Sequence, residues 1–232
     1  MNWANECAVV IPCLNEARKI ESLVTAVRAH IPMVMVVDDG STDRTAALAE
    51  NAGAQVIRLG QTCGKGAALR VGWRRVFEQG FQWALTMDGD GQHSANDIPG
   101  LLAFAENEKA TLVVGNRMTN TGQMPWLRRQ VNRWMSRRLS QMAGQSLPDS
   151  QCGFRLMKLD VWSTLPLQTT HFEIESELLL AFVAGGHDVH FFPIEVIYND
   201  ESSKIHPLRD ALRWFRWRRR EGRTISKSKS KK

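Results

Sequence analysis

The stretch that decides the fold is F-Q-W-A-L-T-M-D-G-D-G-Q-H, residues 81–93. Its apolar first half, residues 81–87, predicts a buried strand that ends at a turn. The strand would end in two carboxylates, Asp88 and Asp90, which share one face of an extended chain because they are two positions apart. Gly89 and Gly91 let the backbone turn and leave room beside the carboxylates.

Two carboxylates on one face repel each other unless a cation lies between them. An oxygen-only ligand set favours Mg²⁺ or Mn²⁺ over Zn²⁺. Mg²⁺ is commonly shared between one or two protein carboxylates and a substrate phosphate. The strand end therefore predicts a site for a metal-bound diphosphate. The alternative is an acidic turn that only closes the strand, because Asp and Gly are ordinary turn residues.

Length and composition indicate one globular domain, since the chain has 232 residues of which 43% are hydrophobic. No apolar run reaches about 18 residues, so we expect no membrane-spanning helix, and the N-terminus does not resemble a signal peptide. The four cysteines form no C-x-x-C pair, which argues against a zinc site or a disulfide framework and for reduced thiols in a cytosolic protein.

The net charge of +6 is distributed unevenly. From Lys204 onward there are 12 basic and 2 acidic residues, so the preceding part is mildly acidic. Within that part, residues 109–148 contain seven basic residues and no acidic one. A basic tail on an acidic body predicts binding to nucleic acid or to an anionic membrane surface.

The rest of the chain predicts strands alternating with helices. Such alternation indicates right-handed βαβ units and a mainly parallel sheet flanked by helices, the α/β class. Asn15 is expected to cap the first of the longer helices. The predicted strands are 7–12, 33–37, 54–59, 81–87, 111–114, 154–157, 189–192 and 194–198, and the predicted helices include 46–52, 65–79, 98–107, 126–142 and 175–184.

Polar clusters follow three of these strands, at residues 14–16, 38–39 and 88–90. Ligands of parallel sheets bind beyond the carboxyl ends of the strands, so these clusters should meet at one edge of the sheet. This convergence favours a functional site over a simple acidic turn.

The predicted helix at 126–142 carries an apolar stripe flanked by arginines. It is either a core helix with a solvated basic face or an interfacial helix, with Trp at lipid headgroups and Arg on lipid phosphates. A second basic helix is predicted from Pro207, and the Ser/Lys tail 226–232 is expected to be disordered. Each basic residue near an anionic leaflet contributes about 1 kcal/mol. The alternatives for this end are a solubilising or an RNA-binding tail. The apolar stripe of the predicted helix 126–142 consists of Leu127, Val131, Trp134, Met135, Leu139 and Met142.

Eight short motifs occur in the order known from one enzyme family. The chain resembles the family 2 glycosyltransferases of GT-A fold, nearest the dolichyl- and polyprenyl-phosphate sugar transferases. The resemblance implies a Rossmann-like GT-A domain over 1–206, a basic amphipathic helix over 207–225 and the tail 226–232. The motifs are VVIPCLNE (9–16), VVDDGSTD (36–43), GKGAAL (64–69), MDGDGQH (87–93), VGNR (114–117), DSQCGFR (149–155), FEIESEL (172–178) and ESSK (201–204).

The resemblance also implies roles for single residues. Asp88 and Asp90, with Gly89 between them, would hold the metal and the donor diphosphate, and Gln92 would be a further metal-side residue. Asp149 is the candidate general base. The pocket for the base and ribose of the nucleotide would comprise Pro12, Asn15, Glu16, Val37 and Asp39, and the phosphate contacts would be Arg117, one of Arg128 and Arg129, and Lys204.

The expected activity is inverting, metal-dependent transfer of a hexosyl unit from a UDP- or GDP-sugar to a polyprenyl phosphate. We expect Mg²⁺ or Mn²⁺ as cofactor, and a peripheral position on the cytoplasmic face of the cell membrane without specific nucleic-acid binding. A lipid phosphate is already anionic, so a base such as Asp149 is needed only for a hydroxyl acceptor. The alternatives are a saccharide or lipid hydroxyl acceptor, a nucleotidyltransferase, and a non-catalytic membrane or RNA adaptor.

Four further features are expected to be mainly structural. Lys65 lies in a G-K-G that lacks P-loop spacing, so it marks a helix start. His93 is expected to cap or face solvent. Cys152 is not expected to be a nucleophile, because no histidine is evidently placed to activate it. The carboxylates near the acceptor motif would line the acceptor pocket, two of the three only in support: Glu173, Glu175 and Glu177.

Overall fold

A computed structural model describes residues 1–122 and 124–197, together with Trp214 and Trp217. The chain divides into two compact units, Met1–Tyr198 and Asn199–Lys232. In the second unit, Trp214 and Trp217 are helical, with ring centroids 6.4 Å apart. Lys204, the tail 226–232 and all other positions of the predicted helix 207–225 lie outside the described residues.

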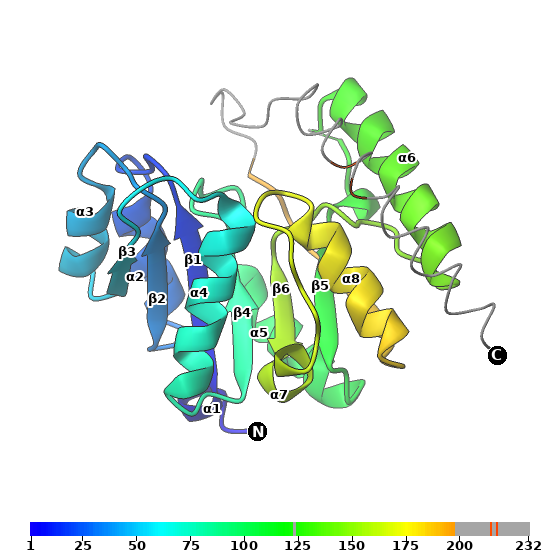
Figure 1. The fold of residues 1–232 in the computed structure, drawn as a ribbon, viewed down its shortest axis with the longest axis horizontal. Helices are drawn as coiled ribbons and strands as arrows, with labels where there is room; N and C mark the ends of the chain where they lie inside the picture. Colours follow the sequence, from blue (N-terminus) through cyan, green and yellow to red (C-terminus); the bar gives the residue numbers. More distant parts are fainter. Residues whose placement is uncertain (123, 198–213, 215–216, 218–232) are drawn as a thin grey trace. The chain divides into compact units, whose positions relative to one another are not determined.

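The first unit is built on one seven-stranded sheet with the order β3-β2-β1-β4-β6-β5-β7 (Figure 1). All pairings are parallel except those of β6, which runs antiparallel between β4 and β5. The α/β class and the mainly parallel sheet are therefore confirmed. The strands are β1 (Cys7–Cys13), β2 (Val34–Asp38), β3 (Gln55–Arg58), β4 (Trp83–Thr86), β5 (Leu112–Asn116), β6 (Arg155–Lys158) and β7 (Val189–Pro193).

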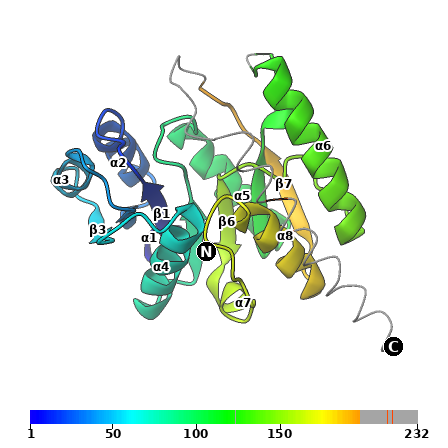
Figure 2. The ribbon, with the colours of Figure 1, turned by 45° about the horizontal axis from the view of Figure 1, so that its top comes forward.

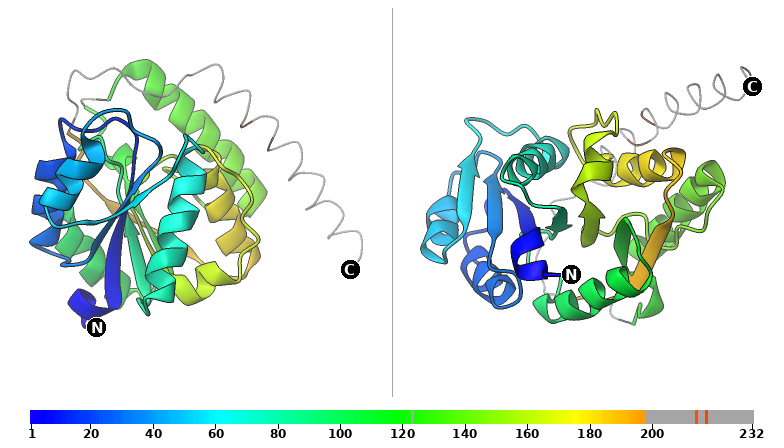
Figure 3. Two further views of the ribbon diagram at one scale, coloured as in Figure 1. Left: turned by 60° about the vertical axis from the view of Figure 1, so that its left-hand side comes forward. Right: turned by 90° about the horizontal axis from the view of Figure 1, so that it is seen from below.

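Helices cover both faces of the sheet (Figures 2 and 3). One layer contains α2 and α5, and the other contains α4 and α8. The 18-residue helix α6 packs against α8. The helices are α1 (Trp3–Glu6), α2 (Ile20–Arg28), α3 (Thr45–Asn51), α4 (Lys65–Glu78), α5 (Ile98–Asn107), α6 (Trp126–Ala143), α7 (Leu159–Ser163) and α8 (Ile174–Ala184), with short 3₁₀ turns at Ala95–Asp97 and Arg117–Thr119.

The central strands are apolar because both of their faces are covered. Every residue of β2 and β4 is buried, and so is all of β1 except Pro12. Helix α4 lies close to this sheet at Gly72, where a Cβ atom would come within 2.5 Å of the Val10 side chain. The next residue, Trp73, donates from Nε1 to Thr86 Oγ1 at 3.0 Å. These contacts fix α4 over β1 and β4.

Two sequence predictions of local structure differ from the structure, and two short helices were not predicted. Asn15 does not cap α2, which begins only at Ile20. Its backbone adopts a φ of 54°, and its Oδ1 instead accepts the Thr42 N–H at 2.9 Å. The predicted strand 194–198 is reduced, over its described residues, to a single bridge between Val196 and His93. Helices α1 and α7 were not predicted, because segments of four and five residues carry too little periodicity.

Candidate active site

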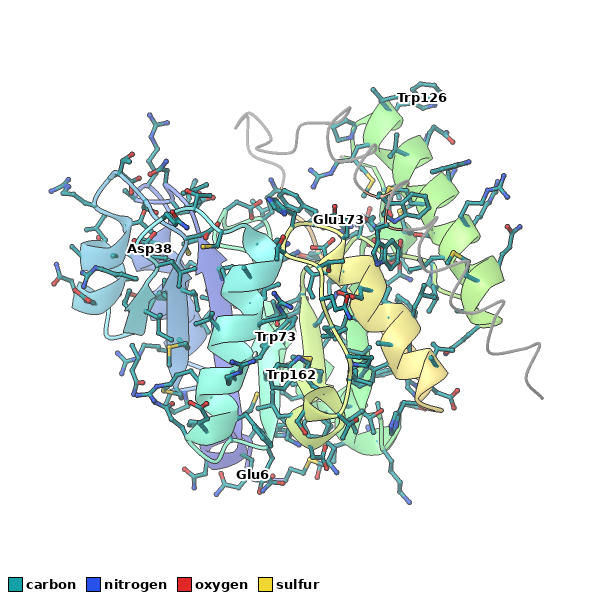
Figure 4. All side chains as sticks on the ribbon, viewed as in Figure 1. Glu6, Asp38, Trp73, Trp126, Trp162 and Glu173 are labelled. Atoms are coloured by element: carbon teal, nitrogen blue, oxygen red, sulfur yellow. The ribbon has the colours of Figure 1, made fainter. Side chains whose placement is uncertain are left out.

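The predicted convergence of polar loops is present at one edge of the sheet. The register places the C-terminal ends of β1, β2, β4 and β5 at the edge where the antiparallel β6 begins. Asp38 and Glu173 lie at this end of the unit and Glu6 at the other (Figure 4). Chain segments far apart in sequence therefore contribute side chains to one edge.

The loops after β1 and β2 are joined by polar contacts. Asn15 N–H donates to Ser41 Oγ at 2.8 Å, and Glu16 N–H donates to Thr45 Oγ1 at 2.8 Å. Asp39 accepts two backbone N–H groups from the loop before α4, those of Cys63 at 2.7 Å and Gly64 at 2.8 Å. Asp39 thus ties a third loop to this edge.

The five residues predicted for the base and ribose lie on these two strands or in the loops after them. Pro12 and Val37 are direct partners in the pairing of β1 with β2. Val37 is fully buried in the sheet, whereas Asn15 is exposed. The structure brings the five together at the strand ends, and their contact with a nucleotide stays a prediction.

The loop after β4 rests on the end of β1. A Cβ atom on Gly89 would lie 2.6 Å from Cys13 Sγ, so a side chain here would push the loop away. Gly91 has a φ of 69°, in the left-handed region. Asp90 Oδ1 accepts the Gln92 N–H at 3.0 Å, and within the described part of the chain no basic side chain pairs with Asp90.

Asp88 differs from Asp90, because it is paired with a buried lysine. Lys65 Nζ lies 2.6 Å from Asp88 Oδ1 and also 2.6 Å from Glu175 Oε1. Burial opposes both charges, but the carboxylates outweigh it and raise the pKa of Lys65, while Lys65 lowers the pKa of Asp88. Lys65 does begin α4, as predicted, but the sequence did not reveal its two partners.

His93 is buried behind the acidic loop. Its Nδ1 accepts the Asp88 N–H at 3.4 Å, which is a capping role, and its ring stacks on Phe154 at 5.5 Å. Burial lowers the pKa of His93, which favours the neutral ring. The expectation that no histidine lies near Cys152 is wrong, because His93 Nε2 is 3.9 Å from its Sγ. Burial nevertheless raises the pKa of Cys152 to about 12, so the thiol stays protonated.

Arg117 and Asp149, for which the resemblance implied separate roles, are paired with each other. Arg117 donates from Nε to Asp149 Oδ2 and from Nη2 to Oδ1, both at 2.8 Å. Asn132 Nδ2 also donates to Oδ1, at 2.9 Å. Asp149 is fully buried; burial would raise its pKa, but Arg117 lowers the pKa to about 2. Both oxygens of this carboxylate are therefore engaged.

Two buried residues have backbone partners that the sequence did not show: Arg155, which was not singled out, and Glu177, which was expected near the acceptor pocket. Arg155 donates to three backbone carbonyls, those of Cys152, Glu175 and Ser150, at 2.7, 2.6 and 3.0 Å. Glu177 accepts the N–H groups of residues 168 and 169, both at 2.9 Å. These particular contacts could not be found in advance, because the partners are backbone atoms that any sequence offers.

The arginines at the start of α6 point to different partners. Arg128 Nη1 donates to Gln92 Oε1 at 3.4 Å, next to the acidic loop. Arg129 Nη1 donates to Thr121 Oγ1 at 3.4 Å, and its buried Nε has no hydrogen-bond partner among the described residues. Arg117 is buried in its pair with Asp149. Phosphate contacts by these three arginines stay a prediction.

The donor set at the acidic loop fits a hard divalent cation. Within residues 1–122 and 124–197, no three His, Cys, Asp or Glu side chains are arranged to hold a metal by themselves. Asp88 and Asp90 offer carboxylate oxygens, and Gln92 offers an amide oxygen. Mg²⁺ and Mn²⁺ bind such sets and take further oxygens from water and substrate phosphates. The predicted ligands are therefore chemically suitable when a diphosphate supplies the remaining oxygens.

Comparisons with known proteins agree with this arrangement. The family model Glycosyl transferase family 2 matches residues 8–165. The UDP-N-acetylglucosamine–dolichyl-phosphate N-acetylglucosaminyltransferase of Methanococcus voltae is 27% identical over 217 residues, covering 84% of this chain and 86% of the relative. The undecaprenyl-phosphate mannosyltransferase of Micrococcus luteus is 30% identical over 168 residues, covering 68% of each chain.

Solved structures match the fold. Glucosyl-3-phosphoglycerate synthase of Mycobacterium tuberculosis, crystallised with Mn²⁺, UDP and glucosyl-3-phosphoglycerate, has a TM-score of 0.66 at 21% identity, covering 85% of this chain and 73% of the other. Another crystal structure of that enzyme contains Mg²⁺ and UDP. The family model covers more than half of this chain, and the fold is that of GT-A enzymes. The chain therefore belongs to glycosyl transferase family 2 and is a glycosyltransferase.

Proposed function

We propose that this enzyme transfers a hexosyl unit from a UDP- or GDP-sugar to a polyprenyl phosphate, with inversion at the sugar and with a divalent cation. The acceptor class is supported by the relatives named for dolichyl phosphate and undecaprenyl phosphate. The observation that carries the proposal is the acidic loop 88–92 beside the arginines of α6. We assign the catalytic domain to 1–206, with 207–225 as a basic helix and 226–232 as a tail.

The donor would lie across the ends of β1, β2 and β4. Asp88, Asp90 and Gln92 would hold Mg²⁺ or Mn²⁺, which when bound neutralises charge on the leaving diphosphate. The loops tied together by Asp39 and Asn15 would hold the base and ribose. Lys204, outside the described residues, is proposed as a further phosphate contact.

The acceptor side favours a phosphate over a hydroxyl nucleophile. A guanidinium can grip a phosphate through two parallel hydrogen bonds. Arg129 offers a buried Nε that no group in the described part of the chain engages, and Arg128 lies next to Gln92. Arg117 and Asn132 occupy both oxygens of Asp149, which leaves this carboxylate badly placed to take a proton. A phosphate acceptor needs no base, and Asp149 as a base stays a prediction for hydroxyl acceptors alone.

We also propose that α6 rests on an anionic membrane surface. Its outer face exposes Trp126 by 66%, Leu127 by 67% and Val131 by 48%, and Trp126 projects from the ribbon (Figure 4). Beside this face a cavity of about 650 Å³ is lined by Arg133 and Arg137, whose side chains also lie on the exposed part of α6. Apolar side chains next to exposed arginines suit a lipid–water interface. No described helix is both long and apolar enough to span a bilayer.

A transfer assay with the full-length chain tests the proposal. UDP-glucose, UDP-N-acetylglucosamine and GDP-mannose are offered with Mn²⁺, to vesicles that contain undecaprenyl phosphate or to soluble sugars. We expect transfer to the lipid, loss of transfer in EDTA, and an inverted anomeric configuration by NMR. Asp90→Asn should lower kcat at least a hundredfold, whereas the exposed Asp160→Asn should not. Transfer to soluble sugars alone would overturn the acceptor assignment.

A further inference from the structure

The acidic loop is paired with a lysine of α4 that the proposed chemistry has not used. Lys65 contacts Asp88 and Glu175 at once, with 2.6 Å from Nζ to each carboxylate. The side chains of Lys65 and Glu175 are only 12% and 8% exposed. Three charged groups from α4, the loop after β4 and α8 therefore form one cluster, which is buried except at Asp88, whose side chain is 27% exposed.

The position of Lys65 is fixed by its surroundings. Its Nζ lies 5.6 Å from the centroid of the Phe172 ring, a cation–π distance. The backbone before it is held by Asp39, which accepts the Gly64 N–H, and Ala67 N–H donates to Thr170 O at 3.1 Å. A lysine usually has much rotamer freedom, but these contacts restrict the backbone and the charged end of this one.

Asp88 is enclosed from the other side by Gly153. A Cβ atom on Gly153 would lie 2.5 Å from Asp88 Oδ2 and 2.6 Å from Oδ1, so the carboxylate packs directly on the backbone. Glu175 is held in turn through its backbone, because Arg155 Nη1 donates to Glu175 O at 2.6 Å. The carboxylate of Asp88 thus has one supported orientation, with Lys65 on one side and Gly153 on the other.

This arrangement makes the two carboxylates of the D-G-D sequence unequal. Asp88 has a resident counter-charge, whereas among the described residues Asp90 has none. The cluster of Lys65, Asp88 and Glu175 carries a net charge of −1, and without the lysine it would carry −2. Any divalent cation that approaches the loop therefore meets a positive charge already seated on one of its two carboxylates.

We propose that Lys65 is a positioning residue that acts as the resident counter-ion of Asp88, and that Glu175 holds it in place. When no metal is bound, Lys65 holds the two aspartates at the strand end in place. Its positive charge also lowers the affinity of the loop for the metal. The expected effect on catalysis rests on the proposed function. The expected effect on metal binding depends only on the charges of the folded chain.

The test measures Mn²⁺ binding to the full chain without nucleotide, by the EPR signal of free Mn²⁺. Lys65→Met removes the charge at similar length, so the Kd for Mn²⁺ should fall at least tenfold, because like-charge repulsion is lost. Glu175→Gln removes one negative charge, so that Lys65 pairs with Asp88 only. The Kd for Mn²⁺ should therefore rise at least threefold. Lys109→Met, an exposed lysine at the end of α5, is the matched control and should change the Kd less than twofold.

Activity then separates positioning from simple electrostatics. In Lys65→Met we expect kcat to fall at least tenfold although the metal binds more tightly, because Asp88 is no longer held. A general collapse of the site would weaken binding and activity together, and circular dichroism checks the fold. A variant that binds Mn²⁺ no better than the wild type would overturn the inference. If no sugar transfer is found at all, the Kd for Mn²⁺ still tests the role of Lys65, because it should fall in Lys65→Met and rise in Glu175→Gln.

Discussion

Asp149 is the residue at this site on which folding depends most directly. It is fully buried and neutralises Arg117, which is itself buried. Asp149→Asn would leave the guanidinium without its counter-charge, and breaking a buried pair in this way costs about 3 kcal/mol or more. We expect the free energy of unfolding, measured in urea, to fall by that amount with an unchanged m-value.

A matched exposed aspartate provides the control for this prediction. Asp160 pairs with Lys158 at 3.4 Å, but its side chain is 64% exposed. Asp160→Asn should change the free energy of unfolding by about 0.5 kcal/mol or less, since surface pairs contribute little. Equal stabilities of the two variants would show that the buried pair does not support the fold.

Residue types at the site were predictable, but their pairings were not. The spacing of Asp88 and Asp90 after an apolar strand identified the acidic loop correctly. The same sequence did not show that Lys65 lies between Asp88 and Glu175, because the lysine and Glu175 are 110 positions apart. Nor did it show that Arg117 and Asp149 bind each other. Such pairings depend on which loops the fold brings together, and no local pattern encodes them.

At the scale of elements, α6 shows why an apolar stripe does not reveal which side faces the core. Helix bounds of 126–142 were predicted, and 126–143 are observed. Yet Leu127 and Val131 are exposed, whereas the buried positions are Asn132, Ser136 and Leu139. The buried side is polar because it binds Asp149 and Ser150. Of the two alternatives for this helix, the core helix does not describe its first turns, because their apolar side faces outward.

If that outward side rests on lipid, polar substitutions on it should release the enzyme from membranes. Trp126→Ser combined with Leu127→Ser should lower binding to vesicles of phosphatidylglycerol at least tenfold, because two exposed apolar side chains no longer enter the interface. Stability should stay within about 0.5 kcal/mol, since both side chains are exposed. Flotation of the full chain with vesicles measures the binding.

Exposed apolar residues elsewhere give the control for this prediction. Val71 on α4 is 36% exposed, and Val71→Ser should leave flotation unchanged. Arg133→Gln with Arg137→Gln should weaken binding to phosphatidylglycerol but not to phosphatidylcholine, because each charge acts through the anionic surface. Undiminished flotation of the variant with serine at positions 126 and 127 would show that this side of α6 does not bind the membrane.

Strand positions were predicted well, and strand directions only in part. The alternation of strands with helices up to residue 116 predicted a parallel sheet, and the first four strands do pair with one another in parallel. The segment at 154–157 predicted a strand, observed at 155–158, but its apolar residues carry no mark of direction. Its antiparallel place between β4 and β5 brings residues 149–155 to the same edge as the acidic loop. The acceptor side of the site depends on this reversal.

At the scale of the whole first unit, buried carboxylates couple folding to pH. Asp149 has its pKa lowered from 3.8 to about 2. The folded protein therefore keeps this group ionised at a pH where the unfolded chain already binds a proton, so stability must fall as pH falls. The contribution is about 2 kcal/mol, complete above pH 5 and lost progressively between about pH 4 and 2. The lowered pKa of Asp88 acts in the same direction.

Urea unfolding at pH 6, 4 and 3 checks this linkage. The wild type should lose stability steeply below pH 4, whereas Asp149→Asn, although less stable throughout, should show a shallower decline, because it lacks one of the groups that bind protons on unfolding. His93, whose pKa burial lowers, also destabilises the folded state in acid, and it is present in both proteins. Subtracting the two curves isolates Asp149. Parallel curves would mean that Arg117 does not depress the pKa of this carboxylate in solution, and the buried pair would then not account for the acid sensitivity of the fold.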